Sequence, residues 1–347
     1  MAREEFTPPP SLRMLGTAID AYRRVFVSGP AAPLLSRRNP VRHNGFDLHL
    51  LVDEVHAEAV DVVSFTLRRA YGGPLPRWRP GAHLDVFLPS GAQRQYSLCG
   101  DPGDRFRYRI AVRRIADGGG GSIEMHRALR TGDPLRVRGP RNAFTFVDAP
   151  SYLFIAGGIG ITPILPMVRA AGDRGRLVYL GRSRATMPFL GELPGDADIR
   201  PDDEFGVPDI AGLLERAEPG AAVYVCGPPP VLAAARRAMF AVNPTGSLHT
   251  ERFSAAPVVD GREFDLTLAR TGRTIRVGAE ETALTAIRRV VPDAVYSCRQ
   301  GFCGTCRTGV LAGEVDHRDH RLSDAERGGH MLTCVSRAAG DALVIDL

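Results

Sequence analysis

The sequence predicts a multidomain fold: an antiparallel β-barrel, then an α/β domain with a parallel sheet, then a small α+β domain. Its 347 residues exceed the roughly 250 that a single hydrophobic core usually supports. Short alternating strands between glycine turns fill residues 46–148, and solid apolar runs alternate with helical patterns over residues 149–258. A hairpin pattern after a proline-containing segment sets residues 259–347 apart as a third domain.

Residues 1–45 precede the first predicted domain as an N-terminal extension. Apolar residues recur there at alternating steps of three and four, which is typical of one amphipathic helix. These residues are Leu12, Leu15, Ile19, Tyr22 and Phe26. Arg13, Arg23 and Arg24 make the helix mildly basic, so contact with a membrane surface or a partner is the alternative. We expect it to pack against the protein's own body.

Charge and hydropathy exclude two classes of function. The formal net charge is +5, but the positive residues are arginines dispersed along the chain without a dense basic run, so nucleic-acid binding is not expected. No apolar run approaches the roughly 18 residues that cross a bilayer. The first residues lack the features of a secretory signal, which leads us to expect a soluble, cytoplasmic protein.

The barrel prediction depends on residues 61–68 and 83–88, which alternate between apolar and polar and are separated by turns. The turns contain Gly72-Gly73, Pro80-Gly81 and Ser90-Gly91. In the next domain, apolar runs at 152–156, 177–180 and 222–226 alternate with helical segments, and this βα order predicts a parallel sheet. In the third, strands at 264–268 and 274–277 flank a turn.

Four cysteines of the third domain have the spacing of a plant-type [2Fe-2S] site. Cys298-x4-Cys303-x2-Cys306 is followed 28 positions later by Cys334, and four thiolates at this spacing ligate two irons. Gly301, Gly304 and Gly309 suit a loop that curls around an inorganic core and directs N–H groups at its sulfurs. This is the most specific pattern in the chain.

Other uses of these cysteines fit less well. A zinc site would need Cys334 to pair with His317, His320 or His330 at irregular distances. A Rieske centre would need Cys-x-His pairs, which the sequence lacks. Structural disulfides are rare between such closely spaced cysteines in the cytoplasm. We therefore predict Cys298, Cys303, Cys306 and Cys334 as the metal ligands.

Residues 259–347 resemble a plant-type ferredoxin attached to the C-terminus of the chain. This arrangement is similar to that of the phthalate dioxygenase reductase family, which includes the vanillate demethylase reductases. The resemblance covers about residues 46–347. It implies an FMN-binding barrel, a NAD-binding α/β domain and a β-grasp ferredoxin domain in that order.

Arg94-Gln95-Tyr96-Ser97 resembles the R-x-Y-S flavin motif of ferredoxin-reductase-like proteins. An arginine can neutralise a flavin phosphate, a tyrosine ring can cover the isoalloxazine, and a serine hydroxyl can donate toward flavin N5. The alternative is an ordinary barrel strand. The motif predicts Arg94, Tyr96 and Ser97 as flavin contacts, with Ser97 also acting at the reacting atom.

A second segment of the barrel supports the same cofactor. Ala111-Val112-Arg113 ends a strand, and a run of four glycines ending at Gly121 leads through Ser122 into a helical pattern. Free N–H groups at a helix start bind anions, and in the family this turn binds the FMN phosphate. A flexible loop is the alternative. No segment for an adenine is evident, so we predict FMN rather than FAD.

A glycine turn after the first strand of the α/β domain predicts nicotinamide binding. It contains Gly158, Gly160, Thr162 and Pro163. Pro163 replaces the third glycine of G-x-G-x-x-G, but proline suits a first helical turn, so pyrophosphate binding there is retained. Thr162 can also reach the flavin edge. This variant resembles the ferredoxin-reductase superfamily.

Two further segments match family elements beside the nicotinamide ring. Cys226-Gly227-Pro228 corresponds to the C-G-P element, and Glu251 with Phe253 to the E-x-F segment that places a ring against the flavin. A buried cysteine and a core phenylalanine are the alternatives. We predict Cys226 and Glu251, with Ser97, as the residues that position the reacting rings.

The coenzyme is expected to be NADH, with NADPH as the alternative. Arg182 and Ser183 follow the strand at 177–180, where no acid is available for a ribose 2′-hydroxyl and an arginine can hold a 2′-phosphate. The family resemblance favours NADH.

Together these sites predict an NADH-dependent reductase that passes hydride to FMN and then single electrons through the [2Fe-2S] cluster to an oxygenase. The resemblance leaves a Rieske-type oxygenase, a cytochrome P450 or a desaturase as the acceptor. A non-catalytic redox carrier or sensor that retains the fold is the alternative from another functional class.

Overall fold

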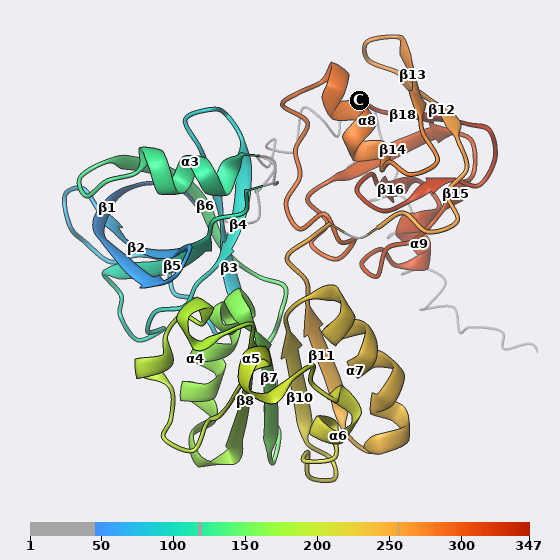
Figure 1. The fold of residues 1–347 in the computed structure, drawn as a ribbon. Helices are drawn as coiled ribbons and strands as arrows, with labels where there is room; N and C mark the ends of the chain where they lie inside the picture. Colours follow the sequence, from blue (N-terminus) through green and yellow to red (C-terminus); the bar gives the residue numbers. More distant parts are fainter. Residues whose placement is uncertain (1–45, 117–119, 256) are drawn as a thin grey trace, which may run out of the picture. The chain divides into compact units, whose positions relative to one another are not determined.

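The computed structural model describes residues 46–116, 120–255 and 257–347 (Figure 1). The predicted amphipathic helix of residues 1–45 lies outside these ranges, as do Gly118 and Gly119 of the glycine run. Among the described residues, no helix combines the length and apolar character needed to cross a bilayer.

The first domain is an antiparallel barrel. Its elements are β1 (Phe46–Ala59), β2 (Val62–Arg69), β3 (Ala82–Phe87), β4 (Gln93–Ser97), β5 (Arg107–Arg113), α3 (Gly121–Ala128) and β6 (Pro134–Asn142). In the described residues the sheet order is β4-β3-β6-β1-β2-β5. A bridge between Leu98 and Ile110 joins its two ends. The alternation seen in the sequence buries Leu50, Phe65 and Leu84 inside the barrel.

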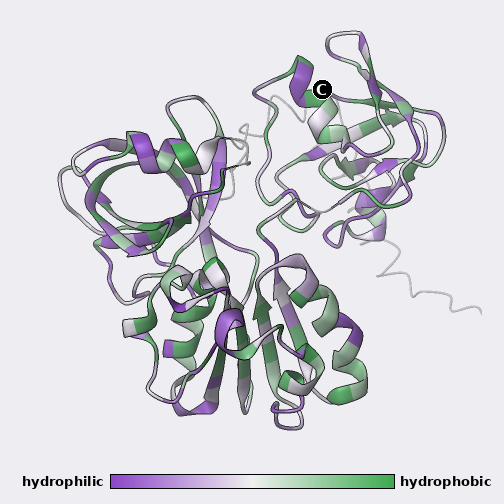
Figure 2. Ribbon diagram, in the orientation of Figure 1, coloured by the Kyte–Doolittle hydropathy of each residue, from purple (hydrophilic) through white to green (hydrophobic). Residues whose placement is uncertain are grey.

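The second domain is the predicted α/β unit. Its elements are β7 (Tyr152–Gly157), α4 (Ile161–Ala171), β8 (Gly175–Gly181), β9 (Asp198–Pro201), α5 (Asp202–Phe205), α6 (Ile210–Leu214), β10 (Ala222–Cys226), α7 (Pro229–Val242) and β11 (Ser247–Glu251). Within the described part of this domain the parallel sheet has the order β11-β10-β7-β8-β9. The strands β7, β8 and β10 are mostly hydrophobic along their length (Figure 2). They are buried on both faces, because α4 packs on one and α6 with α7 on the other.

The third domain has the expected β-grasp arrangement. Its elements are β12 (Phe264–Leu268), β13 (Arg273–Val277), α8 (Ala283–Val290), β14 (Arg307–Ala312), β15 (Val315–Asp316), α9 (Asp324–Arg327), β16 (His330–Leu332), β17 (Arg337–Ala338) and β18 (Ala342–Ile345). The hairpin β12–β13 pairs through β12 with the parallel strand β18. The α8 helix is capped by Thr282, whose hydroxyl accepts a hydrogen bond from the Thr285 N–H at 3.1 Å, and the helix buries Leu284 and Ile287.

The predicted fold class is therefore confirmed. The exact limits of the three domains remain a prediction. One local expectation was wrong: Gly309 is in strand β14 and not in the cysteine loop. A Cβ on Gly309 would lie 3.4 Å from the Asp346 Cβ, so the close approach of neighbouring chain accounts for a small residue there.

Candidate functional site

A cavity of about 200 Å³ is bordered by β4, β5, the start of α3 and the start of α4. It brings together most of the residues predicted to contact flavin: Arg94, Tyr96, Ser97, Ala111, Arg113, Gly121, Ser122, Thr162 and Phe253. Gln95, Ile115 and Ile159 line it as well and were not predicted. Ile159 could have been predicted, because it lies inside the glycine turn, whereas no sequence pattern indicates that Ile115 lines the cavity.

One end of this cavity has the features of a phosphate site. The helix α3 begins at Gly121, directly under the Arg94 side chain, where a Cβ would lie only 2.5 Å from Arg94 Nε. The preceding Gly120 has a positive φ of 75°, which turns the chain into the helix. Ser122 Oγ accepts a hydrogen bond from the Ile115 N–H at 3.0 Å, which fixes the turn. A helix start beside an arginine is suited to an anion.

Val112 is not brought into the cavity. Its side chain is buried in the barrel core, and its carbonyl oxygen is 2.9 Å from His126 Nε2. Neighbouring residues of a strand face opposite sides, so Ala111 and Arg113 line the cavity and Val112 faces away from it.

The other end of the cavity holds the side chains expected around the reacting ring. Ser97 and Thr162 are buried there, and Thr162 Oγ1 donates to the Ile159 carbonyl at 3.0 Å. Phe253 is 50% exposed and lines the cavity, so it is not the core residue that was the alternative. An exposed ring at the mouth of a ring-sized cavity is suited to stacking on a planar cofactor. Burial raises the pKa of Tyr96 to about 12, which keeps its phenol neutral.

The two predicted nicotinamide segments come into contact. Strands β7 and β10 are parallel neighbours, so the turn with Gly158 and Gly160 meets the turn with Cys226 and Gly227 at the same sheet edge. A Cβ on Gly160 would lie 2.2 Å from the Cys226 carbonyl oxygen. Both turns lead into helix starts, α4 with Pro163 in its first turn and α7, which is preceded by Pro228. The edge thus presents two helix N-termini to an anionic ligand.

Glu251 completes this edge. It pairs with Cys226 in the β10–β11 register, and its Oε2 is a buried atom without a hydrogen-bond partner among the described residues. Burial raises the pKa of Glu251 to about 8. Burial, and next to it the Glu251 charge, raises the pKa of the Cys226 thiol well above its usual value. Both groups are therefore uncharged at neutral pH.

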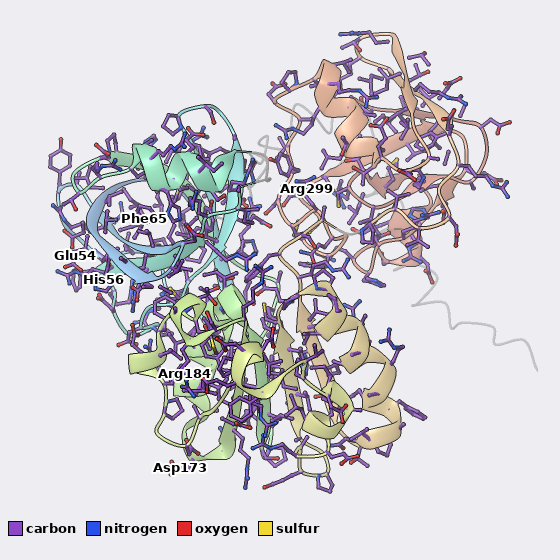
Figure 3. The ribbon with its side chains drawn as sticks, viewed as in Figure 1. Glu54, His56, Phe65, Asp173, Arg184 and Arg299 are labelled. Atoms are coloured by element: carbon purple, nitrogen blue, oxygen red, sulfur yellow. The ribbon has the colours of Figure 1, made fainter. Side chains whose placement is uncertain are left out.

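The segment after β8, where the coenzyme's ribose is expected, contains more than the sequence suggested. Ser183 is the N-cap of a short 3-10 helix, and the Arg182 carbonyl accepts from the Asp203 N–H at 3.2 Å. Arg184, which is labelled in Figure 3, forms a paired contact with Glu204, Nε to Oε1 at 2.8 Å and Nη2 to Oε2 at 3.0 Å. Glu204 follows β9, so an acid absent from the β8 turn is supplied by the neighbouring strand.

The four predicted metal ligands lie together in the third domain. Side-chain hydrogen bonds connect Cys298 with Cys303 and Cys334, and Cys306 with Cys334. Backbone N–H groups point at the sulfurs: Gln300 N is 3.4 Å from Cys298 Sγ, and Thr305 N is 3.5 Å from Cys303 Sγ. Arg299, Gly301 and Gly304 have positive φ angles, which let the loop curl around the thiols.

The four thiols are coupled: the pKa of Cys298 and that of Cys306 are lowered, whereas hydrogen bonds to these two thiols raise the pKa of Cys303 and that of Cys334. The neighbouring Cys303 thiol, then Cys334, and then the N–H groups of Gln300 and Phe302 hold the pKa of Cys298 far below its usual value. No three His, Cys, Asp or Glu side chains of the described ranges are grouped to hold a single metal ion. A [2Fe-2S] cluster needs no such group, because four thiolates are shared between two irons. The residues therefore fit a two-iron cluster, and the flavin cavity fits a phosphorylated ring.

The remaining two cysteines are separate from this set. Cys99 is buried at the end of the barrel, where burial raises the pKa of its thiol to about 12. Cys226 is at the carboxyl end of β10, in the segment predicted to contact nicotinamide.

A small pocket connects the flavin cavity with the cysteine loop. It is lined by Tyr96 and Ser97 from the flavin strand, Glu251 and Phe253 from the nicotinamide edge, and Cys298 from the loop. Tyr96, Ser97 and Phe253 also line the flavin cavity. The three predicted sites thus meet around β4.

Known proteins share this arrangement. A family model described as a 2Fe-2S iron-sulfur cluster binding domain matches residues 266–339. The phthalate dioxygenase reductase of Burkholderia cepacia is 38% identical over 321 residues, which is 88% of this chain and 99% of that protein.

Two solved structures are similar over most of the chain. A phthalate dioxygenase reductase, described as a modular structure for electron transfer from pyridine nucleotides to [2Fe-2S], matches with a TM-score of 0.66 and 38% identity over 87% of this chain and 98% of its own. An intact type IV self-sufficient cytochrome P450 monooxygenase matches with a TM-score of 0.70 and 41% identity over 92% of this chain and 44% of its own. The chain belongs to the phthalate dioxygenase reductase family.

Proposed function

We propose that the protein is the reductase of an oxygenase system, in which NADH delivers a hydride to FMN and single electrons leave through the [2Fe-2S] cluster. The observation that carries this proposal is the shared strand β4. Tyr96 and Ser97 line both the flavin cavity and the pocket that Cys298 borders. A ring bound in that cavity would lie one strand away from a cluster ligand.

When bound, a flavin accepts two electrons as one hydride and releases them singly, and a [2Fe-2S] cluster takes one at a time. The protein's side chains bind and orient these groups. Arg94 and the start of α3 would hold the flavin phosphate, and the Ser97 hydroxyl would donate to the ring edge. The uncharged Cys226 and Glu251 would border the nicotinamide without adding a charge where hydride arrives.

We favour FMN and NADH as the cofactors. The phosphate end of the flavin cavity is bordered by Gly121 and Arg94, which suits the single phosphate of FMN. At the nicotinamide domain, Glu204 already pairs with Arg184, so this guanidinium is engaged by a carboxylate and not available for a 2′-phosphate. Coenzyme supply then favours the cytoplasm as the location.

The acceptor is proposed to be an oxygenase component, either a Rieske-type non-haem iron oxygenase or a cytochrome P450. The relative from Burkholderia cepacia is named for a dioxygenase, and the similar P450 is a self-sufficient monooxygenase. Their names support both classes of acceptor. Comparing the rates at which the reduced protein delivers electrons to each class distinguishes them.

The proposal is tested on the purified full-length protein. It should release FMN on denaturation, contain iron and acid-labile sulfide, and reduce cytochrome c with NADH. A non-catalytic carrier would contain the cluster but show no NADH turnover. A protein purified without flavin, and unable to take it up, would refute the proposal.

A further inference from the structure

Strand β4 contacts both the flavin cavity and the cysteine loop. Arg94 and Tyr96 line the cavity, and Gln93 and Gln95 bond to the residues that precede Cys298, although Gln95 also borders the cavity. Gln93 Nε2 donates to the Tyr296 carbonyl at 2.9 Å, and Gln95 Nε2 donates to Ser297 Oγ at 2.7 Å. The strand that carries the flavin motif thus also supplies the contacts to the cysteine loop.

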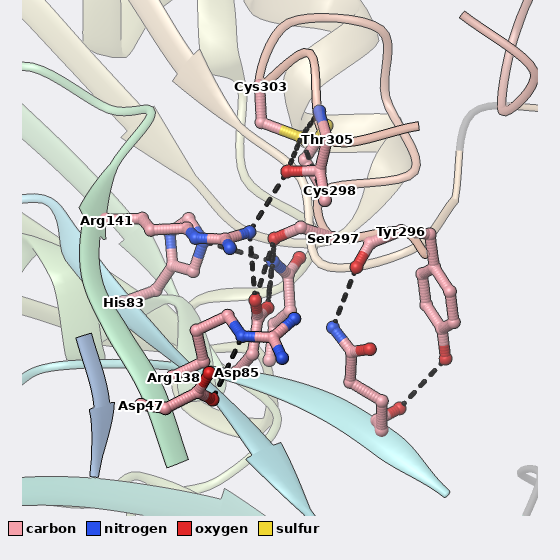
Figure 4. A network of polar contacts seen from close by, with 12 residues as sticks. Asp47, His83, Asp85, Arg138, Arg141, Tyr296, Ser297, Cys298, Cys303 and Thr305 are labelled. Carbon is pink, nitrogen blue, oxygen red and sulfur yellow. Dashed lines mark hydrogen bonds and ion pairs between the residues drawn. The ribbon is translucent and has the colours of Figure 1, made fainter. Parts of the chain in front are cut away.

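The fully buried carboxylate of Asp85 on the neighbouring strand β3 contacts both β4 and the cysteine loop. Asp85 of β3 accepts from Ser297 Oγ and from Gln95 Nε2, both at 2.9 Å, and its Oδ2 is 3.0 Å from Arg141 Nη1 of β6 (Figure 4). The Asp85 side chain is 0% exposed and that of Arg141 is 10% exposed. A buried charge is tolerated only when it is paired and hydrogen-bonded, as Asp85 is.

The same arginine reaches the far end of the cysteine loop. Arg141 Nη1 donates to Thr305 Oγ1 at 3.0 Å, and Thr305 Oγ1 is 3.3 Å from Cys303 Sγ (Figure 4). Ser297 immediately precedes Cys298, and Thr305 lies between Cys303 and Cys306. The loop is thus held to the barrel on both sides of its first two thiols.

We propose that Asp85, Gln95, Arg141, Ser297 and Thr305 form a latch that fixes the Cys298–Cys303 loop against the flavin strand and thereby sets the rate of electron transfer from flavin to cluster. This rests on the proposed function. In each transfer one electron leaves the reduced flavin and converts one ferric ion of the cluster to ferrous, with no bond formed or broken. The five side chains are positioning residues, because they act on the loop and not on the reacting atoms.

The chemistry of the latch indicates that it fixes the position of the cysteine loop more than it stabilises the fold. A buried ion pair is weak support for stability, because its desolvation offsets most of its attraction, but it requires one arrangement of its partners. Here those partners come from three strands of the barrel and from the cysteine loop, more than 160 residues further along the chain. Removing one donor would leave the Asp85 charge buried and free the loop to shift.

The test compares Arg141→Gln with Arg138→Gln in the holoprotein. Both arginines are on β6, and Arg138 is similarly buried at 12% exposed, but its partner is Asp47, 3.1 Å away on the surface (Figure 4). In an anaerobic single turnover with NADH, flavin reduction should be unchanged in both variants. Electron arrival in the cluster should be severalfold slower in Arg141→Gln alone, because a loop that can shift no longer holds the cluster at a fixed separation from the flavin. Arg141→Lys should recover part of the rate, because it keeps the charge and one donor.

Hydrogen–deuterium exchange provides a readout that is independent of turnover. Backbone amides of residues 296–306 should exchange faster in Arg141→Gln and at the wild-type rate in Arg138→Gln. If Arg141→Gln does not assemble its cluster, Ser297→Ala makes the same comparison with the loss of a single hydroxyl. Wild-type rates of both cluster reduction and exchange in these latch variants would overturn the latch. A wild-type protein whose flavin is not reduced by NADH would instead overturn the proposed function.

Discussion

Cys226 and Glu251 are paired neighbours at the carboxyl ends of the adjacent parallel strands β10 and β11. Burial is the first cause of the raised pKa of each, and the Glu251 charge adds to the shift of the Cys226 thiol. The Glu251 charge thus favours the neutral form of the Cys226 thiol. The edge where nicotinamide is proposed to bind is uncharged at neutral pH and gains a negative charge when Glu251 ionises, near pH 8.

The first prediction concerns the pH dependence of hydride transfer. Ionised Glu251 would oppose the negative charge that the flavin gains with a hydride, so flavin reduction by NADH should slow as pH rises through about 8. Glu251→Gln keeps a neutral side chain of similar shape and should remove this decline. Stopped-flow rates across the pH range check it, with the exposed Glu215→Gln as the control that retains the decline. A decline that persists in Glu251→Gln would assign it to another group.

The same carboxyl predicts a pH-dependent stability. The pKa of Glu251 is raised from 4.5 to about 8 in the folded protein. Its contribution to the free energy of unfolding is therefore fully present below about pH 4.5 and is lost as pH rises to about 8. The Tm of the wild type relative to Glu251→Gln should fall across this window in scanning calorimetry of the holoprotein. A difference that is constant with pH would show that Glu251 titrates with an ordinary pKa.

Flavin binding should depend on the absence of a side chain at Gly121. A Cβ there would lie 2.5 Å from Arg94 Nε, so Gly121→Val would push Arg94 from the helix start and block the proposed phosphate position. We expect weaker FMN binding, by about tenfold or more, since loss of a charge-assisted hydrogen bond costs about 1.5–3 kcal/mol. Titration of the flavin-free protein with FMN measures this. Gly191→Ala, where a Cβ has no neighbour within 4 Å, should bind FMN as the wild type does.

Sites built from contiguous motifs could be predicted from the sequence, because the geometry of a parallel sheet brings the ends of its strands together. Cys226 ends one buried strand of the parallel sheet and Gly160 follows another, and such strands end at the same edge. The metal ligands could be predicted from the cysteine spacing for a similar reason, because Cys298 to Cys306 form one short, contiguous loop.

The latch could not be predicted, because its members are far apart in sequence and carry no motif. Ser297 and Asp85 are 212 residues apart, and Arg141 is one of many arginines. One signal was present: His83 and Asp85 are polar in a strand that is otherwise apolar, which indicates buried polar contacts without naming the partners. Similarly, Glu204 could not be placed beside Arg184 until the order of β8 and β9 was known.

The cluster ligands are predicted to be separable from the other cysteines by metal analysis. Cys306→Ala removes a thiol that is hydrogen-bonded to Cys334 and should lower iron and acid-labile sulfide well below the two of each per chain of a [2Fe-2S] cluster. Cys99→Ala should keep the full content, because Cys99 is buried in the barrel and its sulfur bonds to the Arg109 carbonyl. Full iron content in Cys306→Ala would remove that residue from the ligand set.

The last prediction concerns coenzyme choice. Arg184 is paired with Glu204 by two contacts, and the two side chains are 50% and 44% exposed. Glu204→Ala removes the carboxylate that engages Arg184 and repels a 2′-phosphate. The ratio of kcat/KM for NADPH to that for NADH should rise severalfold, mainly through KM for NADPH, because the coenzyme's phosphate gains a cationic partner.

Two variants control this comparison. Glu215→Ala removes an exposed negative charge at the end of α6 in the same domain and should leave the ratio unchanged. Arg184→Ala combined with Glu204→Ala should cancel most of the gain, because the phosphate then lacks the arginine. An equal gain in the double variant would mean that relief of repulsion by Glu204, and not binding by Arg184, controls the choice of coenzyme.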